Sequence, residues 1–220
     1  MSNKTHDHKT ILIELHAFPS IRYMATISAF DRVLIEAFEN YQKGSYRNRY
    51  YIGSSQGPLR LSVPLTKGKH QSQPITQVQM LDGASWRKLH WRSIQSSYGK
   101  SPFYDFYKDE LFERFVAEEK SLFDWNLENL KLLLKCFNLN LAIELSSSYE
   151  KNITDSQITD YRNIIKPQNT PNQTNLPETV FHYEQVFTKE VGMLYDLSTL
   201  DLLFCLGPEA GRRFKMNNRE

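Results

Sequence analysis

The chain has 220 residues, of which 40% are hydrophobic and 13% aromatic, and this composition excludes a disordered protein. Its length predicts a single domain over residues 1–220. The formal net charge of only +2 excludes binding to nucleic acid by bulk electrostatic attraction, so we predict no nucleic-acid partner.

Residues 1–9 are polar and lack the apolar stretch of a signal peptide, so they are predicted to form a disordered tail. No apolar run approaches the length of a membrane span. Both features predict a cytoplasmic protein without a transmembrane segment. Cys136 and Cys205 lie in apolar surroundings, and no CxxC or HExxH spacing occurs, so we predict free thiols and no metal site.

Two short apolar runs near the N-terminus, at residues 10–15 and 33–35, predict neighbouring strands. The segment between them, at residues 21–30, has the apolar spacing of a helix. Continuous apolar strands joined by a helix are typical of a βαβ unit with helices on both faces of the sheet. We therefore predict an α/β fold with a mainly parallel or mixed sheet and flanking helices.

Two segments with alternating apolar residues, at 59–65 and 76–80, predict half-buried strands. Three helices should follow. The first covers residues 86–98 after a cap at Ser85, the second is centred on Leu111, and the third covers residues 123–137.

Residues 141–145 predict a further strand, whereas residues 152–177 are polar, contain several Pro and Asn, and predict a surface loop. Ser198 and Asp201 have the spacing of a capping box that opens a helix over residues 200–206. A Gly-Pro pair then predicts the end of that helix.

The segment 40–49 concentrates arginine, lysine, amide and tyrosine side chains without helical or strand periodicity. Guanidinium groups beside aromatic and amide groups are suited to recognising a carboxylate, a phosphate or a sugar. The alternative interpretation is a hairpin whose tyrosines cover the edge of the core. The predicted substrate-binding residues here are Tyr41, Lys43, Tyr46, Asn48 and Arg49.

The predicted helix at residues 86–98 has a basic face formed by Lys88 and Arg92, with no acidic partner one turn away. We predict that Lys88, Tyr98 and Lys100 also bind substrate, and that Lys88, His90, Arg92 and Lys100 meet Arg47 and Arg49 in one anion-binding cleft. The alternative is a half-buried helix with a solvated basic side.

His90 and His16 are the candidates for proton transfer, because imidazole titrates near neutral pH. Glu14 and Glu36 close the two predicted parallel strands, where ligand sites of such sheets lie. We predict catalytic roles for His90, Glu14 and Glu36. The alternatives are a packing histidine and salt bridges to nearby arginines. No GxGxxG, P-loop or GxSxG motif is present.

Short motifs follow one another in order through nearly the whole chain. They are Phe18-Pro19 and Tyr23; Asp31; Tyr41, Lys43, Tyr46 and Asn48-Arg49; Val63-Pro64; Trp86, Lys88, His90, Ile94, Tyr98 and Lys100; Tyr183 and Gln185; Leu197-Ser198; and Asp201, Leu202, Leu203 and Phe204. With these motifs the chain resembles the WbqC-like family of bacterial proteins.

The chain departs from that family at three places. Glu14-Leu15 stands where members usually have Gln-Pro, Arg22 replaces a glycine, and Ala37-Phe38 replaces an Asp-Asp pair. If that pair acts as a base or a metal ligand in relatives, Glu36 or Glu39 would have to substitute for it here.

Members of the family occur in gene clusters for O-antigen and other surface polysaccharides, and glycine or aminoacyl transfer has been suggested for them. The resemblance therefore implies a transferase of this pathway. Together with the clustered cations, it predicts an anionic donor that is nucleotide-linked or phosphate-bearing. The alternative is a non-catalytic binding module for a sugar phosphate or a partner enzyme, which the lack of a recognisable nucleophile–base pair favours. A third interpretation is that single-stranded nucleic acid stacks on Arg and Tyr side chains, but the small net charge of the chain gives it little support.

Overall fold

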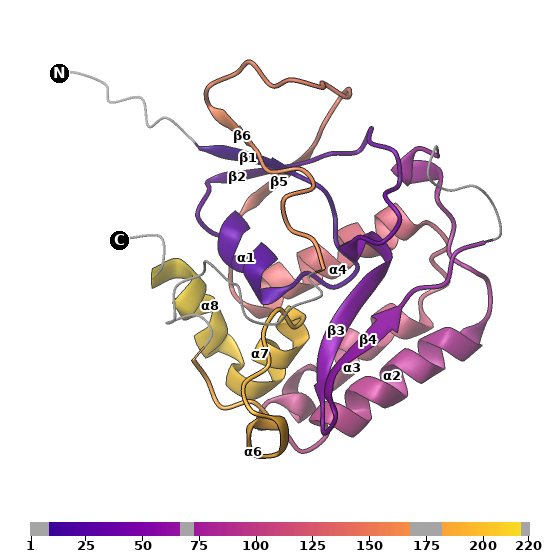
Figure 1. Cartoon of the computed structure of the whole chain (residues 1–220), viewed down its shortest axis with the longest axis vertical. Coiled ribbons are helices and arrows are strands. Elements are labelled where there is room, and N and C mark those ends of the chain that lie inside the picture. The colour runs from indigo at the N-terminus through magenta and orange to yellow at the C-terminus, as the bar shows by residue number, and fades with distance from the viewer. Residues whose placement is uncertain (1–8, 67–72, 168–181, 217–220) are drawn as a thin grey trace.

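The structure, a computed structural model, describes residues 9–66, 73–167 and 182–216. It confirms the predicted α/β fold (Figure 1). Four strands form a parallel sheet in the order β5-β2-β1-β6. They are β1 (Thr10–Ile13), β2 (Arg32–Ile35), β5 (Ala142–Leu145) and β6 (Ile158–Asp160).

The predicted βαβ unit is confirmed. α1 (Ile21–Ile27) joins β1 to β2, and Ile11 lies opposite Val33 in parallel register. Both residues are fully buried and belong to the main hydrophobic core. The hydroxyl of Ser20 caps α1 by accepting a hydrogen bond from the amide of Tyr23.

β6 corrects the prediction that residues 152–177 form only a surface loop. It extends the sheet beside β1, with Thr10 opposite Ile158. The sequence pattern hid this strand because it is a three-residue edge strand whose last two residues are polar and exposed. Residues 168–177 of that segment, and residues 1–8 of the predicted tail, lie outside the described residues.

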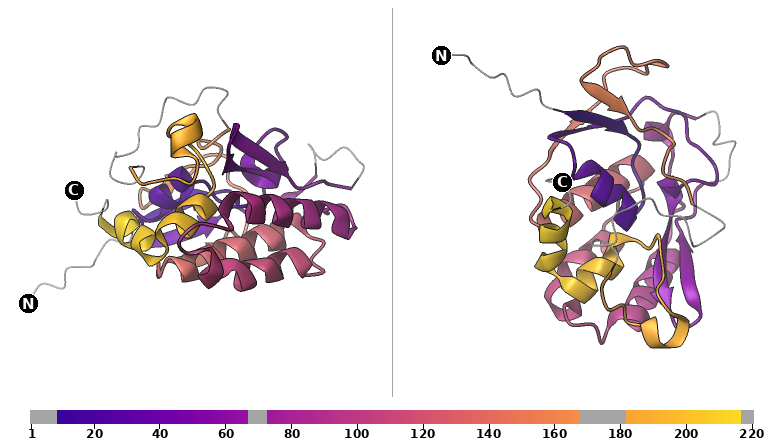
Figure 2. Two further views of the ribbon diagram at one scale, coloured as in Figure 1. Left: turned by 90° about the horizontal axis from the view of Figure 1, so that it is seen from below. Right: turned by 60° about the vertical axis from the view of Figure 1, so that its left-hand side comes forward.

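An antiparallel hairpin of β3 (Arg49–Ser54) and β4 (Gly57–Ser62) lies against the helices, separate from the parallel sheet (Figure 2). β4 confirms the first part of the strand predicted at residues 59–65. The strand predicted at residues 76–80 is wrong. That segment begins within the short 3₁₀ helix η3 (Ile75–Gln77) and continues through two isolated bridges to different partners, so no ladder forms.

Three long helices follow as predicted. They are α2 (Ala84–Tyr98), α3 (Tyr104–Val116) and α4 (Leu122–Cys136). Ser85 does not cap α2, because the helix already begins at Ala84. Gly83 occupies the cap position, with φ of 123°. α2 packs against β3 and α3, which joins the hairpin to the helical layer.

The C-terminal helices are α6 (Thr188–Val191), α7 (Thr199–Leu206) and α8 (Pro208–Met216). α7 confirms the helix predicted at residues 200–206, and Ser198 caps it by accepting a hydrogen bond from the amide of Leu200. The predicted stop does not end the helical region. Gly207 turns the chain with φ of 55°, and Pro208 begins α8, because proline suits the first position of a helix.

Asp201 points into the core instead of closing the predicted capping box. Its carboxylate accepts hydrogen bonds from the hydroxyls of Tyr98 at 2.8 Å and Tyr183 at 2.5 Å. Tyr98 Oη in turn accepts from the amide of Gly53 at 2.9 Å, and Tyr183 Oη from Gln185 Nε2 at 3.2 Å. We call these five residues the Asp201 cluster. It ties α7 to α2 and to β3.

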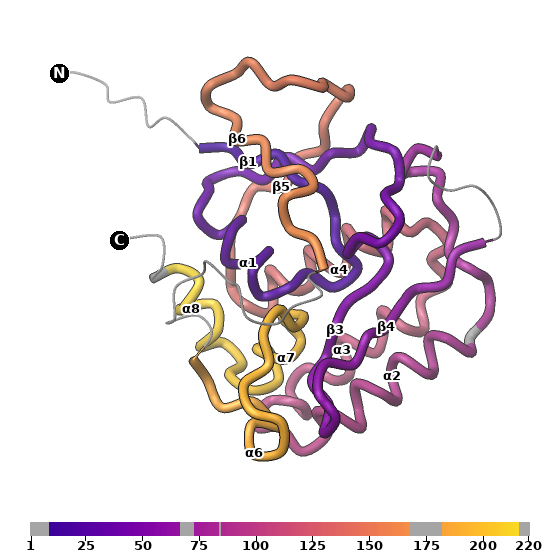
Figure 3. Tube along the Cα trace, viewed as in Figure 1, coloured from indigo at the N-terminus to yellow at the C-terminus, as the bar shows by residue number. Residues whose placement is uncertain are grey.

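The tube in Figure 3 shows the chain after β6 running from the sheet towards the segment that precedes β3. A hydrogen bond of 2.9 Å from Arg47 Nη2 to Asn163 Oδ1 joins the two segments. No helix among the described residues is both long and apolar enough to cross a bilayer.

Candidate functional site

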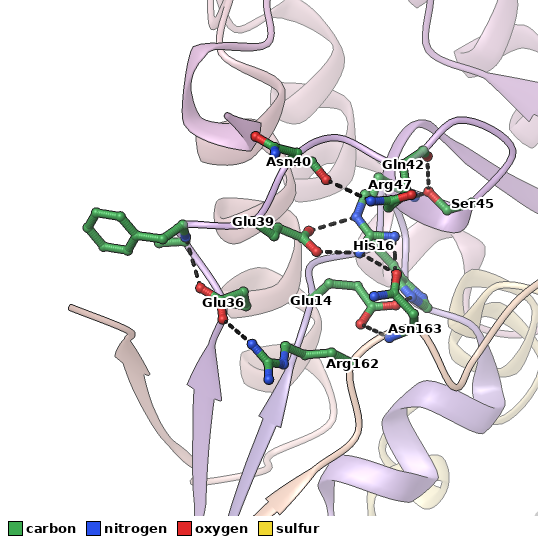
Figure 4. A network of polar contacts seen from close by, with 12 residues as sticks. Glu14, His16, Glu36, Glu39, Asn40, Gln42, Ser45, Arg47, Arg162 and Asn163 are labelled. Atoms are coloured by element: carbon green, nitrogen blue, oxygen red, sulfur yellow. Dashed lines mark hydrogen bonds and ion pairs between the residues drawn. The ribbon is translucent and has the colours of Figure 1, made fainter. Parts of the chain in front are cut away.

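The carboxyl ends of β1, β2 and β6 meet at one edge of the parallel sheet, and charged side chains gather there (Figure 4). The order of strands reverses at β1, which has β2 on one side and β6 on the other. Ligands of open α/β sheets bind beyond the strands at such a reversal. Glu14 and Glu36 directly follow β1 and β2, as expected from the sequence. We define the sheet-edge cluster as Glu14, His16, Glu36, Glu39, Arg47, Arg162 and Asn163.

Arg47 is the central cation of this cluster and comes from the 3₁₀ helix η1 (Tyr46–Asn48). Its side chain is 1% exposed and donates two hydrogen bonds to the carboxylate of Glu39, at 2.7 Å and 2.5 Å. Burial raises the pKa of Glu39, and the contact with Arg47 opposes that rise. The charge of Arg47 is therefore neutralised within the protein.

Glu14 is buried and holds two neighbours in place. Its Oε2 accepts a hydrogen bond from the backbone amide of Asn163 at 2.8 Å, and its Oε1 lies 3.6 Å from His16 Nε2. Burial alone would raise the pKa of Glu14, but the contacts with His16 and Arg47 outweigh it and lower the pKa. Glu14 is therefore a carboxylate at neutral pH, placed to stabilise a protonated His16.

The imidazole of His16 lies between the rings of Tyr23 and Tyr46, at centroid distances of 4.5 Å and 5.0 Å. Burial lowers the pKa of His16, so the ring is neutral at pH 7. Neither ring nitrogen has a hydrogen-bond partner among the described residues. A neutral imidazole beside a carboxylate can accept a proton as a general base.

Two residues near this edge adopt left-handed backbone conformations that are uncommon outside glycine. Asn163 and Asp196 both have φ of 60°. Asn138, with φ of 57°, is in the same region of backbone conformation but follows the C-cap residue of α4, where such a conformation is ordinary. Unusual backbone held in place by surrounding contacts is a feature of functional sites.

Asp196 joins the sheet edge to the C-terminal part of the chain. Its Oδ2 accepts a hydrogen bond from the hydroxyl of Tyr46 and lies 3.4 Å from Arg22 Nη2. Arg22 also donates to the carbonyl of Lys166 at 3.0 Å. Burial raises the pKa of Asp196, while the hydroxyl and the guanidinium favour its charged form.

Both carboxylate oxygens of Glu36 bind groups of the protein itself. This arrangement matches the salt bridge that the sequence suggested as the alternative to a catalytic role. Its carboxylate accepts hydrogen bonds from the Ser146 hydroxyl at 2.8 Å, from Arg162 Nη1 at 2.8 Å and from the amide of Phe38 at 2.9 Å. Among the described residues, no group of three or more His, Cys, Asp and Glu side chains is arranged to hold a metal ion.

His90 and Tyr98 lie in the core, away from the sheet edge. His90 is 2% exposed, its Nδ1 is 3.0 Å from the hydroxyl of Tyr50, and its ring packs against Trp86. Burial lowers the pKa of His90 to about 4. These contacts are those of a packing histidine. Tyr98 belongs to the Asp201 cluster.

The segment 40–49 contains both buried and accessible members. Tyr41 and Tyr46 are buried, and Asn48 donates to the carbonyl of Val63 at 3.0 Å. Arg49 is half-buried, and its Nε has no hydrogen-bond partner among the described residues. Lys43 is exposed. The tyrosines therefore cover the core, whereas Arg49 and Lys43 remain candidates for binding an anion.

Lys88 lies in a different place, an open groove of about 580 Å³ between α2 and α3. Its lining also includes Arg92, Trp91 and Phe112, but no residue of segment 40–49. The structure therefore does not bring Lys88 and Arg49 together in this groove. Lys100 is exposed just beyond the end of α2.

Sequence reasoning missed Arg22, Arg162, Asn163 and Asp196. Arg162 and Asn163 follow β6, so recognising that strand would have placed them at the sheet edge. Asp196 carries no local signal, because its role depends on tertiary contacts with Tyr46 and Arg22.

Comparison with known proteins adds to this geometry. The model of the WbqC-like protein family matches residues 16–173, well over half of the chain. The chain belongs to this family. It is also 24% identical over 223 residues to the uncharacterized protein Rv1507c of Mycobacterium tuberculosis, covering 92% of this chain and 95% of that protein. No solved structure gives a significant match.

Proposed function

We propose that this WbqC-like protein is a cytoplasmic transferase of O-antigen or surface-polysaccharide biosynthesis. It uses an anionic donor, nucleotide-linked or phosphate-bearing, and the transferred group suggested for the family is glycyl or another aminoacyl group. Family membership supports the pathway. The observation that supports the chemistry is the Glu14–His16 pair at the reversal point of the sheet.

In this proposal His16 takes the proton-transfer role predicted for His90. A hydroxyl or amine of the acceptor bonds to the transferred group as the bond to the anionic leaving group breaks. The acceptor's proton passes to a ring nitrogen of His16, and Glu14 stabilises the resulting imidazolium. Asn163 holds Glu14 through its backbone amide.

Arg49 and Lys43 bind the donor, because neither forms an ion pair among the described residues and Arg49 has an unpartnered Nε. An arginine can grip a phosphate or carboxylate through two parallel hydrogen bonds, which a lysine cannot do. Glu36 is a positioning residue in this proposal: its carboxylate holds Arg162 beside the site.

Donor binding is tested by a thermal-shift screen of nucleotides, nucleotide sugars and aminoacyl donors, since a ligand of the native state raises the melting temperature. For a donor found in this way, Arg49→Lys should weaken affinity about 10-fold or more, because one charged hydrogen bond is lost. Arg92→Gln, in the groove between α2 and α3, is the matched control and should bind normally. Equal affinity of the wild type and Arg49→Lys would overturn the donor assignment.

Turnover is tested with His16→Gln. This variant should still bind the donor but lose about 10²–10⁴ in rate, the usual contribution of a general base. Donor consumption and product formation can be followed together by mass spectrometry. A variant that turns over at the wild-type rate would exclude His16 as the base.

The second candidate is a non-catalytic module that binds a sugar phosphate or a partner enzyme. Complete pairing of Arg47 and Arg162 with carboxylates favours it, because these cations serve structure and not a substrate. In that case ligands would bind the wild type and His16→Gln equally, and neither protein would consume donor.

A further inference from the structure

Buried polar atoms without partners are concentrated at one place beside the sheet edge. Eight buried side-chain nitrogen or oxygen atoms of the described residues lack a hydrogen-bond partner, and four of them belong to His16, Arg22 and Asp196. They are both ring nitrogens of His16, Nε of Arg22 and Oδ1 of Asp196. Buried polar groups are nearly always paired, because leaving one unpaired costs about 1–3 kcal/mol. This concentration needs an explanation.

Arg22 contacts Asp196 directly, and Tyr46 links Asp196 to His16. Arg22 Nη2 lies 3.4 Å from Asp196 Oδ2, and the hydroxyl of Tyr46 donates to the same oxygen. The ring of Tyr46 lies 5.0 Å from the ring of His16. Because Arg22 and Tyr46 both engage Oδ2, the other carboxylate oxygen of Asp196 remains free to accept a hydrogen bond.

The chemistry of the free atoms selects among ligands. Arg22 Nε can only donate, Asp196 Oδ1 can only accept when ionised, and a hydroxyl group can serve both at once. A phosphate or carboxylate would be repelled by the negative charge of Asp196, and an ammonium group would be repelled by the positive charge of Arg22. A neutral ligand with several hydroxyl groups satisfies both residues without repulsion.

The three side chains differ in how far they are exposed to solvent. The side chains of Arg22 and Asp196 are 15% and 18% exposed, whereas that of His16 is only 1% exposed. The free atoms are themselves buried, so a ligand would have to displace the groups that cover them, and it would meet Arg22 and Asp196 before the imidazole. Tyr51, half-buried and 6.1 Å from the ring of Tyr46, adds apolar ring surface for the C–H face of a sugar.

We propose that Arg22, Asp196 and His16 form the acceptor subsite of this protein and that it binds a neutral sugar through a hydroxyl group. This inference rests on the proposed transferase function. The hydroxyl donates to Asp196 Oδ1 and accepts from Arg22 Nε, and a neighbouring hydroxyl lies against His16.

Binding of neutral hexoses tests the subsite. Ligand-observed NMR with methyl glucoside and methyl galactoside, and with their singly deoxygenated analogues, should detect binding of at least one hexose to the wild type. Removing one particular hydroxyl should abolish that binding. Asp196→Asn, which tolerates the left-handed backbone, and Arg22→Gln should each weaken it about 10-fold or more, because each loses a charged hydrogen bond. Arg92→Gln is the control and should bind as the wild type does.

Inorganic phosphate and methylammonium serve as competitors and should not displace the hexose. Displacement by either, or equal binding by the wild type and Arg22→Gln, would overturn the proposal. So would a folded wild type that binds none of these sugars, since the unpartnered atoms would then hold water only. Using Arg22→Gln keeps the test decisive if Asp196→Asn fails to fold.

Failure of the subsite and failure of the transferase function give different results. Hexose binding that depends on Arg22 and Asp196, without any donor consumption, supports the subsite and argues against the transferase. Donor consumption that is unaffected by Arg22→Gln and Asp196→Asn supports the transferase and overturns the subsite.

Discussion

Two buried groups of acidic and hydroxyl side chains differ in how completely their polar atoms are paired. In the Asp201 cluster both carboxylate oxygens accept tyrosine hydroxyls, and both hydroxyls accept a further hydrogen bond. At the sheet edge, His16 and Asp196 keep unpartnered atoms. A fully satisfied network fixes the elements that it joins, whereas a partly satisfied one is costly unless a ligand completes it.

The two groups also differ in how their charge is compensated. Arg47 lies within the sheet-edge cluster and lowers the pKa of Glu14, together with His16. The hydrogen-bond partners of Asp201 are neutral, and burial raises its pKa to about 6. Glu14 is therefore kept ionised at neutral pH by counter-charge, whereas Asp201 depends on hydroxyl donors alone.

The largest effect is expected from breaking the ion pair at the sheet edge. Glu39→Ala leaves the buried guanidinium of Arg47 without its main partner, which should cost about 3–5 kcal/mol of unfolding free energy. Chemical denaturation measures the loss. Glu128→Ala, which removes an exposed partner of Lys131, is the control and should cost less than about 1 kcal/mol. Similar costs for the two variants would contradict the central role of Arg47.

The next effect is a pH dependence that belongs to Asp201. Its pKa rises from 3.8 to about 6 on folding, so the folded state binds the proton more tightly and stability falls as pH rises through this window. The rise of about two pKa units corresponds to about 3 kcal/mol. The neighbouring Tyr98, Tyr183 and Cys205 all have raised pKa values and stay protonated there.

Asp201→Asn removes this titration. Relative to the wild type, the unfolding free energy of the variant should therefore be about 2 kcal/mol more favourable at pH 7 than at pH 4, and the difference should approach about 3 kcal/mol only below the unfolded pKa of 3.8. Denaturation at several pH values checks this difference, and the contribution of His90 cancels because both proteins contain it. A constant difference across the range would show that Asp201 does not titrate near pH 6.

A smaller effect is expected from Tyr183→Phe. The variant removes one hydroxyl donor to the Asp201 carboxylate and should cost about 1–3 kcal/mol at pH 7. It should also raise the pKa of Asp201 further, because that hydrogen bond favours the ionised form. Tyr149→Phe, at an exposed tyrosine, supplies the matched control and should leave stability nearly unchanged.

The smallest effect on stability is expected from His16→Gln, because the imidazole makes no hydrogen bond that the variant could lose. We expect a loss of about 1 kcal/mol, because the buried ring contacts with Tyr23 and Tyr46 are lost. His90→Gln should cost more, since it disturbs the contact with Tyr50 in the aromatic core. Thermal and chemical denaturation of both variants would measure the contrast, and a larger loss from His16→Gln would reverse the roles given to the two histidines.

The sequence predicted those parts of the fold that depend on local pattern. The apolar runs around Ile11 and Val33 and the cap at Ser198 needed no tertiary information, and all three are confirmed. The edge strand β6 could not be predicted, because its short polar sequence is held only by pairing with β1. Asp201 fitted the spacing of a capping box, and only the packing of Tyr98 and Tyr183 shows its other role.

The candidate site was predictable to the extent that it depends on strand ends. Glu14 was placed correctly because it closes an apolar strand. His90 was selected for its position on a basic helix, but helical spacing does not reveal that this side packs against Tyr50. Arg22 and Asp196 come from positions far apart in the chain and meet only in the folded protein, so no local motif could identify them.

Because β6 is short, the site can come apart while the rest of the protein stays folded. Three residues pair this strand with β1, at the outer edge of the sheet, and Asn163 lies three residues after its end. Local opening of so short an edge strand requires far less free energy than global unfolding. Each opening would release Glu14 from Asn163 while the rest of the core stays intact. The amides of β6 should accordingly exchange with solvent sooner than those of β1 and β2, and the assembled site is the closed state of this local equilibrium.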